Sequence, residues 1–584
     1  MMSSKMHAGV MGGLLALVWM GSAVAQTPEP PFSWDAATVY FVMTDRFVNG
    51  DPSNDHAYGR GFDAEGNPYD FDPSGHFHGG DLAGLTQKIE EGYFDDLGVN
   101  ALWITNPFEQ IHGWIGGGEG DFQFYAYHGY WVLDFTELDA ALGTEADFRR
   151  FVDAAHAHGL RVVLDVILNH AGYNTLADMD AFDFGAITDA GWRAWRPAGG
   201  ENWHGYHDRF IDYAGADSAW ARWWGPAWVR AGLPGYDPCG EDETTRCLGS
   251  LPDFKTDSDA PVEIPVFLRE KWGPEKLAKE EAELNAFFAR TGYPRTPRYH
   301  LIKWVTDWVE RYGIDGFRVD TAKHVEPETW RALKREAVRA LRTWKAAHPA
   351  EVLDDLDFWM TGEVWGHGVE RDAYFDNGFD SLINFTFQPA AAASADLDSL
   401  YAAYAGRING DPSFNVLSYL SSHDTRLFDR TRLVEAGTRL LMLPGGVVIY
   451  YGDETARPPG PDVSADDQPT RSPMNWDAVD ADVLAHWQKL GRFRRRHPAV
   501  ARGAHRKLSD APYAFHRHYA SGAFTDDVIV VTGAEGRTRL NVSHVFPDDT
   551  VLRDAYTGKI AIVSYGLVTF APGPQGVLLI EEVR

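Results

Sequence analysis

Four short segments of this sequence run from apolar residues directly into a histidine or a carboxylate. They end in Asn169-His170, Arg318-Val319-Asp320, Gly362-Glu363 and His423-Asp424. Cleavage of a glycosidic bond needs one carboxylic acid that protonates the leaving oxygen and one carboxylate that attacks or stabilises the oxocarbenium-like carbon. Asp320, Glu363 and Asp424 could supply these groups, so their types favour chemistry on sugars. A buried network of ion pairs is the alternative interpretation.

Arg318 and two histidines fit the same chemistry. Arg318 precedes Asp320 by two residues on a predicted strand, so both side chains point to one side and the cation would keep Asp320 ionised. His170 and His423 can donate hydrogen bonds to sugar hydroxyls while they are neutral.

These residues need elements that bring them to one place. Short apolar, β-branched runs predict strands at residues 38–43, 100–104, 160–166, 313–319, 358–361, 381–385, 415–420 and 446–450. Amphipathic segments separate the strands, and one of them has helical spacing at Leu301, Trp304, Val305, Trp308 and Tyr312. Eight strands alternating with helices predict an α/β fold, a (β/α)8 TIM barrel, with its site at the carboxyl ends of the strands.

The spacing of the strands also predicts domains. The third and fourth strands are too far apart for one connection, so residues 171–295 are expected to form an inserted domain, with the barrel in residues 26–170 and 296–499. The insertion holds a tryptophan cluster, interpreted as its core or alternatively as a sugar platform: Trp192, Trp195, Trp203, Trp220, Trp223, Trp224 and Trp228. Strands without helices follow, and residues 500–584 predict an antiparallel β domain, a β-sandwich.

Residues 1–25 have the pattern of an export signal. Lys5 gives a basic start, residues 10–20 are apolar, and Ala23-Val24-Ala25 fits a cleavage site before Gln26. The apolar run is too short for a membrane span, so a periplasmic or secreted protein is expected. Because export favours oxidation, a disulfide between Cys239 and Cys247 is preferred over two free thiols.

The net charge of the chain limits the classes of ligand that it can bind. The 584 residues include 53 Lys and Arg against 84 Asp and Glu, which gives a formal net charge of −31. Such a surface repels phosphate backbones, so nucleic acid is a poor candidate partner. Neutral ligands and cations both agree with this charge. A monomer is expected.

The four segments together resemble the signature regions of the α-amylase superfamily, glycoside hydrolase family 13. Three further stretches are similar to that family: Leu251-Pro252-Asp253, His78-Gly79-Gly80-Asp81-Leu82 and Tyr127-His128-Gly129-Tyr130-Trp131. The resemblance spans residues 39–502. Residues 108–114, 359–363 and 417–426 read like the bacterial periplasmic α-amylases of the family.

The resemblance implies roles for individual residues. Asp320 would be the nucleophile, Glu363 the general acid/base, and Asp424 would bind sugar hydroxyls and stabilise the transition state. The residues implied to contact substrate are His128, Tyr130, His170, Arg318, Lys323, His324 and His423. Of these, Lys323 and His324 would face the leaving-group side, and Tyr130 would stack on a sugar ring. The family retains anomeric configuration through a covalent glycosyl-enzyme, which agrees with two-carboxylate chemistry.

Calcium is the metal that the resemblance implies. Asn169, Asp253 and the main-chain carbonyl of His324 match the ion site between barrel and insertion, and such hard oxygen ligands suit Ca²⁺. A second candidate resembles an N-terminal calcium loop of cyclodextrin-forming relatives and comprises Asn49, Asp51, Asn54, Asp55, Gly79 and Asp81. Asn49 stands where an aspartate is usual, and an Asn- and Asp-rich turn held by its own side chains is the alternative.

Three functions agree with these residues. The first is an exported, endo-acting α-amylase that hydrolyses α-1,4-glucan. The second is a transglycosylase or cyclomaltodextrin-degrading enzyme on the same scaffold. The third is a glucan-binding or transport-accessory protein without catalysis, against which the presence of all three carboxylates argues.

Overall fold

A computed structural model describes residues 31–62, 75–117, 121–393, 396–461 and 468–583 of the chain. The predicted export signal at residues 1–25 lies outside this range. Within it, no helix is both long and apolar enough to cross a membrane.

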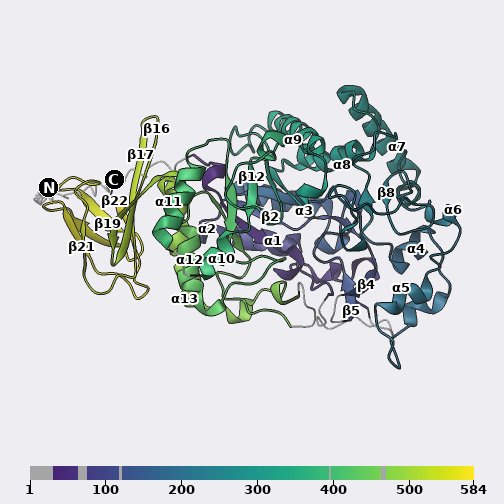
Figure 1. Ribbon diagram of the computed structural model, residues 1–584, viewed down its shortest axis with the longest axis horizontal. Helices are drawn as coiled ribbons and strands as arrows, with labels where there is room; N and C mark the ends of the chain where they lie inside the picture. The colour runs from purple at the N-terminus through teal and green to yellow at the C-terminus, as the bar shows by residue number, and fades with distance from the viewer. Residues whose placement is uncertain (1–30, 63–74, 118–120, 394–395, 462–467, 584) are drawn as a thin grey trace, which may run out of the picture.

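Eight parallel strands close into a barrel at the centre of the molecule (Figure 1). They are β1 (Thr38–Val42), β2 (Ala101–Ile104), β7 (Arg161–Val166), β10 (Gly316–Val319), β11 (Trp359–Gly362), β12 (Ser381–Asn384), β13 (Val416–Tyr419) and β14 (Gly446–Tyr450). All eight are buried along their whole length, as expected of strands that side chains cover on one face and helices on the other. The predicted (β/α)8 barrel is confirmed, with small shifts at the ends of strands.

Helices surround the barrel and bury one face each. They include α1 (Leu82–Glu90), α3 (Glu145–Ala157), α8 (Pro297–Tyr312), α9 (Pro327–Ala347), α11 (Leu397–Ile408), α12 (Leu433–Leu441) and α13 (Ala481–Arg496). The predicted apolar positions of α8 are buried, among them Leu301 and Trp308. The expected alternation is incomplete between β11 and β12, where the described connection forms only the short 3-10 helix η9 (Phe375–Asn377).

Two small antiparallel sheets lie between β2 and α3, where only barrel elements were expected. One pairs β3 (Phe108–Gln110) with β6 (Val132–Leu138), and the other pairs β4 (Trp114–Gly117) with β5 (Phe122–Tyr125). Their short strands carry little periodic signal in the sequence. They matter because the loop between β5 and β6 carries His128 and Tyr130.

The long segment between β7 and α8 lies at one end of the molecule (Figure 1). It contains α4 (Leu176–Phe182), α5 (Gly205–Phe210), α6 (Asp217–Trp220), β8 (Val229–Arg230), β9 (Asp253–Phe254) and the kinked helix α7 (Val266–Thr291). Trp220, Trp223, Trp224 and Trp228 are at most 2% exposed, so most of the tryptophan cluster is core and not a sugar platform. Cys239 and Cys247 form the expected disulfide. The exact limits of residues 171–295 stay a prediction.

The C-terminal residues form antiparallel sheets at the opposite end of the molecule (Figure 1). Six strands make one sheet: β15 (Ala504–Asp510), β16 (Tyr513–Ser521), β17 (Phe524–Thr532), β22 (Leu578–Glu582), β19 (Val551–Asp554) and β20 (Lys559–Ile562). A second sheet pairs β18 (Thr538–Asn541) with β21 (Leu567–Phe570). Ile529, Leu540, Val568 and Leu578 share one apolar cluster that joins the two sheets, which confirms the predicted C-terminal β domain.

Candidate active site

Two carboxylates leave neighbouring strands at the same level of the barrel. Val319 of β10 and Gly362 of β11 are register partners, and the next residues are Asp320 and Glu363. Parallel strands end on one side of a barrel, so this register places both side chains at its mouth. Asp320 and Glu363 are 7% and 8% exposed.

Arg318 joins both carboxylates through different nitrogens. Its Nη1 lies 2.8 Å from Asp320 Oδ1, and its Nη2 lies 2.8 Å from Glu363 Oε2. The same Nη1 lies 2.9 Å from Asp165 Oδ1, and Asp165 is fully buried. Thr321, a β-branched residue in the left-handed region at φ 48°, donates its main-chain N–H to Glu363 Oε2 at 3.1 Å. The network fixes the orientation of both catalytic candidates.

The local environment shifts the pKa values of the three carboxyl groups in different ways. Burial raises the pKa of Glu363 to about 7; Arg318 opposes this shift, whereas Asp320 and Asp424 add to it. Burial also raises the pKa of Asp320, against the direct contact with Arg318. Asp424 is different, because His423 and Arg471 outweigh burial and hold its pKa below the usual value. Glu363 is therefore the carboxyl best able to carry a proton at neutral pH.

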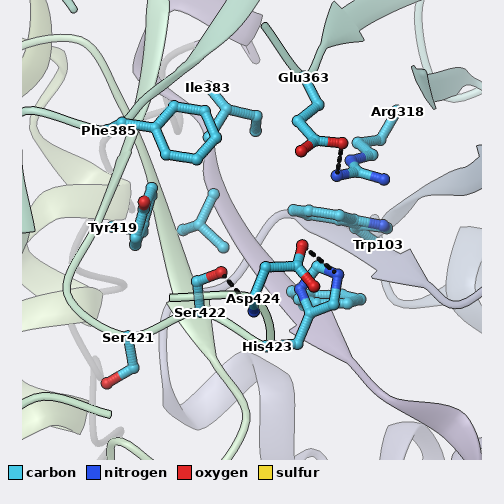
Figure 2. Close-up of a pocket in the computed structure, with 12 residues that line it drawn as sticks. Trp103, Arg318, Glu363, Ile383, Phe385, Tyr419, Ser421, Ser422, His423 and Asp424 are labelled. Atoms are coloured by element: carbon cyan, nitrogen blue, oxygen red, sulfur yellow. Dashed lines mark hydrogen bonds and ion pairs between the residues drawn. The ribbon is translucent and has the colours of Figure 1, made fainter. Parts of the chain in front are cut away.

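Asp424 faces Glu363 across a cavity shown in Figure 2. His423 Nε2 lies 2.9 Å from Asp424 Oδ2, and Arg471 Nη2 lies 3.0 Å from Asp424 Oδ1. The other walls of this cavity are mostly apolar and comprise Phe41, Trp103, Ile383, Phe385, Tyr419 and Val448. A carboxylate with a lowered pKa therefore lies opposite one with a raised pKa, with room between them.

Aromatic rings and histidines form a second wall. A cavity that contains Asp320, Glu363 and Asp424 is also lined by Phe124, His128, Tyr130, Trp131, His170, Leu248, Leu251, Thr321 and Arg471. The Tyr130 hydroxyl lies 2.9 Å from Asp165 Oδ2 and 2.7 Å from His423 Nε2. Burial lowers the pKa of His170 to about 4 and that of His128 well below its usual value. Both rings are therefore neutral in the physiological range.

The predicted substrate residues Lys323 and His324 do not line either cavity. They follow Asp320 and turn toward the inserted segment, where His324 Nδ1 lies 2.9 Å from the main-chain oxygen of Glu243. Lys323 Nζ lies 3.8 Å from the carboxylate of the same residue.

The first calcium candidate offers two hard oxygens at the joint of barrel and insertion. Within the described part of the chain, Asn169 Oδ1 and Asp253 Oδ1 are buried without a hydrogen-bond partner. Asp253 forms an antiparallel bridge with His170, next to Asn169. Burial raises the pKa of Asp253 to about 7 although Arg230 donates to its other oxygen at 2.9 Å. Unpartnered oxygens of this type fit Ca²⁺.

The second candidate loop is closed largely by its own groups. Asp81 accepts hydrogen bonds from the main-chain N–H groups of Gly50 and Asp51, and from Asn54 Nδ2. Asn49 Nδ2 donates to Asp55 Oδ1 at 2.8 Å. These bonds support the alternative of a self-held turn, although Asn54 Oδ1 is buried without a described partner. Across the described ranges, no group of three His, Cys, Asp or Glu side chains is arranged to hold a metal ion.

Sequence reasoning missed several residues of the site. Asp165 falls within the predicted strand 160–166, and its alternation with Arg161 and Val163 is the signal that places it inside the barrel. Trp103 donates its indole N–H to Asp165 at 3.2 Å. The signal in the sequence that could have identified Trp103 is its position near the end of β2. Arg471 reaches Asp424 from the long segment after β14, where no local pattern marks it.

The match to known sequences agrees with this geometry. The sequence model described as the α-amylase catalytic domain matches residues 41–222 and 295–489, which is more than half of the chain. The chain belongs to the α-amylase family and is a glycoside hydrolase.

Individual relatives extend the comparison. The chain is 48% identical over 520 residues to the periplasmic α-amylase of Escherichia coli (strain K12), across 86% of this chain and 72% of that protein. It is 24% identical over 535 residues to a cyclomaltodextrin glucanotransferase of Niallia circulans, across 89% of this chain and 63% of that protein. A solved α-amylase of Anoxybacillus shares the fold with a TM-score of 0.58 at 21% identity, across 95% of this chain and 99% of that one.

Proposed function

We propose that the chain is an exported, endo-acting α-amylase that hydrolyses α-1,4-glucosidic bonds of starch and maltodextrins with retention of configuration. One observation carries this proposal. Asp320 and Glu363 leave adjacent strands at matched register and contact separate nitrogens of Arg318, while the pKa of Glu363 is raised to about 7. A carboxyl group that can carry a proton near neutral pH therefore lies beside a carboxylate whose ionised form Arg318 favours.

In the first step, Glu363 gives its proton to the glycosidic oxygen while an Asp320 oxygen attacks C1 of the sugar. The bond between C1 and the glycosidic oxygen breaks, the shortened chain leaves with the proton as its new hydroxyl, and C1 is bound to Asp320 as an ester. The Arg318 contact to Asp320 at 2.8 Å holds the attacking group in place.

In the second step, the ionised Glu363 takes a proton from water as the water oxygen attacks C1. The bond from C1 to Asp320 breaks, the carboxylate is restored, and the sugar leaves with its original anomeric configuration. The raised pKa of Glu363 suits both halves of the cycle, because the group must give and accept a proton near neutral pH.

Asp424 binds the sugar between the two catalytic carboxyls. Its depressed pKa keeps it ionised, so it can accept hydrogen bonds from sugar hydroxyls and favour positive charge at C1. His423 and His170 complete the polar contacts, and the Tyr130 ring supplies an apolar face.

Calcium would be held by Asn169, Asp253 and the main-chain carbonyl of His324. The ion would supply structural cross-linking of the inserted segment to the barrel. The loop of Asn49, Asp51, Asn54, Asp55, Gly79 and Asp81 is the weaker site, because its carboxylates already accept hydrogen bonds from the chain.

The place of action would be the periplasm or the medium. The export pattern of residues 1–25 supports this assignment, together with the disulfide and a relative named as periplasmic.

Product analysis tests the proposed function. Proton NMR of maltoheptaose digests should show the α-anomer forming first, and Asp320→Asn should abolish it. Formation of the β-anomer first would contradict retention. Added glucose should change the product pattern little; if longer products dominated, the enzyme would be a transglycosylase.

A further inference from the structure

The disulfide of the inserted segment closes a small ring, residues 239–247, whose tip reaches the barrel mouth. Inside the ring, Gly240 N donates to Thr245 O at 2.8 Å, and Thr245 N donates to Asp242 O at 3.2 Å. A Cβ at Gly240 would lie 2.0 Å from Thr245 Oγ1, so the turn needs glycine there. The ring is therefore compact and braced internally, and Glu243 lies at its tip.

Glu243 contacts the pair of residues that follow the catalytic strand β10. The main-chain oxygen of Glu243 accepts a hydrogen bond from Nδ1 of His324 at 2.9 Å, and its carboxylate Oε2 lies 3.1 Å from the same nitrogen. Oε2 also lies 3.8 Å from Lys323 Nζ. Two acceptors on one ring nitrogen favour the tautomer that carries the proton on Nδ1, which leaves Nε2 as an acceptor in the neutral ring.

The chain immediately after the ring belongs to the wall of the cleft. Leu248 and Leu251 line the cavity that contains Asp320 and Glu363. Between them, the main-chain oxygen of Gly249 accepts a hydrogen bond from the Tyr173 hydroxyl at 2.6 Å. The segment that directly follows the ring therefore forms part of this wall and is held to Tyr173.

We propose that Glu243 is a positioning residue that orients His324 and Lys323 toward glucose units on the leaving-group side, and that the disulfide ring holds Glu243 in place. This inference rests on the proposed function and on the family resemblance, which implies that the pair faces the leaving-group side, outside the two cavities described above. Oriented side chains bind distant sugar units without a further loss of rotamer freedom. Loss of Glu243 should therefore weaken binding of long chains and leave the bond-breaking groups unaffected.

The test compares two substrates in excess free calcium. Maltoheptaose extends glucose units beyond the cleaved bond, whereas an aryl α-maltotrioside places only its aryl group there. Glu243→Ala should raise KM for maltoheptaose about three- to fivefold, as expected of one half-exposed charge contact. It should leave kcat for the aryl glycoside within about twofold. Glu243→Gln, which can still accept a hydrogen bond, should recover part of the loss.

Two further variants distinguish a positioning role of Glu243 from a general effect on the stability of the protein. Cys239→Ser/Cys247→Ser should raise KM for maltoheptaose at least as much as Glu243→Ala. Glu241→Ala, in the same ring without a contact to His324, should match the wild type. Unchanged KM in Glu243→Ala would overturn the inference, as would an equal loss on both substrates with a lower melting temperature. Wild-type protein that cleaved neither substrate would instead refute the proposed function.

Discussion

Asp165 and Arg318 form a buried ion pair at the base of the site. Arg318 Nη1 lies 2.9 and 3.1 Å from the two oxygens of Asp165, and the two residues are register partners on β7 and β10. Asp165 contacts neither Asp320 nor Glu363 in any recorded hydrogen bond or ion pair of the described chain. It fixes the guanidinium that contacts both, and its charge also contributes to the raised pKa of Asp320.

Asp165→Asn tests this relationship. The amide keeps the shape of the side chain but removes the charge that holds Arg318 and the Tyr130 hydroxyl. We expect kcat on maltoheptaose to fall about 100-fold, the size of effect that misplaced catalytic groups produce. Steady-state kinetics measure this loss, and circular dichroism shows whether the variant is folded.

Asp139→Asn is the matched control for that variant. Asp139 pairs with the buried Arg60 at 2.8 Å, outside the cleft. Asp139→Asn should lower the melting temperature and leave kcat near the wild-type value. A fall in kcat of similar size in both variants would show that Asp165 has only a structural role.

The raised pKa of Glu363 predicts the alkaline limb of the pH profile. The first step needs the acid form of Glu363. We therefore expect kcat/KM to be highest below about pH 7 and to decline above it, with the slope that loss of one proton gives. Initial rates across pH 4 to 9 at constant ionic strength measure the profile. A limb that begins near pH 5 would show that burial does not hold the proton on Glu363.

The same shift predicts how stability depends on pH. The folded state binds the Glu363 proton more tightly than the unfolded state, whose pKa is near 4.5. This group therefore favours unfolding progressively as the pH rises from about 4.5 to 7. Glu363→Gln cannot ionise, so its melting temperature relative to wild type should rise over that interval and then stay constant. A constant difference from pH 4 to 8 would contradict the shift.

The free energy of unfolding should increase with the concentration of free calcium. The expected gain is RT ln(1 + [Ca]/Kd), about 2.7 kcal/mol at a hundredfold excess over Kd. Chelation should lower both the melting temperature and the activity, because the inserted segment would lose its link to the barrel. Asp253→Asn should flatten the dependence of the melting temperature on free calcium.

Asp257→Asn is the control for the calcium variant. Asp257 contacts Nη2 of Arg230, whereas Asp253 contacts Nη1 of the same arginine. Both variants therefore remove one partner of Arg230, but of the two carboxylates only Asp253 has a buried oxygen without a hydrogen-bond partner in the described chain. Asp51→Ala should change the melting temperature and leave kcat nearly intact. Metal-free wild-type protein with full activity and an unchanged melting temperature would exclude both sites.

Much of this architecture could be predicted from local patterns. The apolar runs before Asp320 and Glu363 mark strands with carboxylates at their ends, and α8 repeats apolar residues at helical spacing. The sequence could not indicate Arg471, because its approach to Asp424 depends on the path of a long segment after β14. The sequence gives little signal for β19, where every second residue is exposed, or for the edge strand β20, where Ile560 and Ile562 are exposed.

Export can be checked on protein isolated from its natural compartment. Mass spectrometry without reduction should find Cys239 and Cys247 bridged, and the mature chain should begin at Gln26. The disulfide of the structure and the pattern of residues 1–25 both lead to this expectation. Two thiols that react with an alkylating reagent would refute the bridge.

Trapping of the covalent intermediate tests the central role of Asp320 most directly. Glu363→Gln should react with α-maltotriosyl fluoride, because fluoride leaves without a proton, but should release the sugar slowly, because no base activates water. Peptide mass spectrometry should then find one maltotriosyl group on the peptide that carries Asp320, and none in the double variant with Asp320→Asn. A sugar on another peptide, or turnover of the fluoride without any adduct, would contradict Asp320 as the nucleophile.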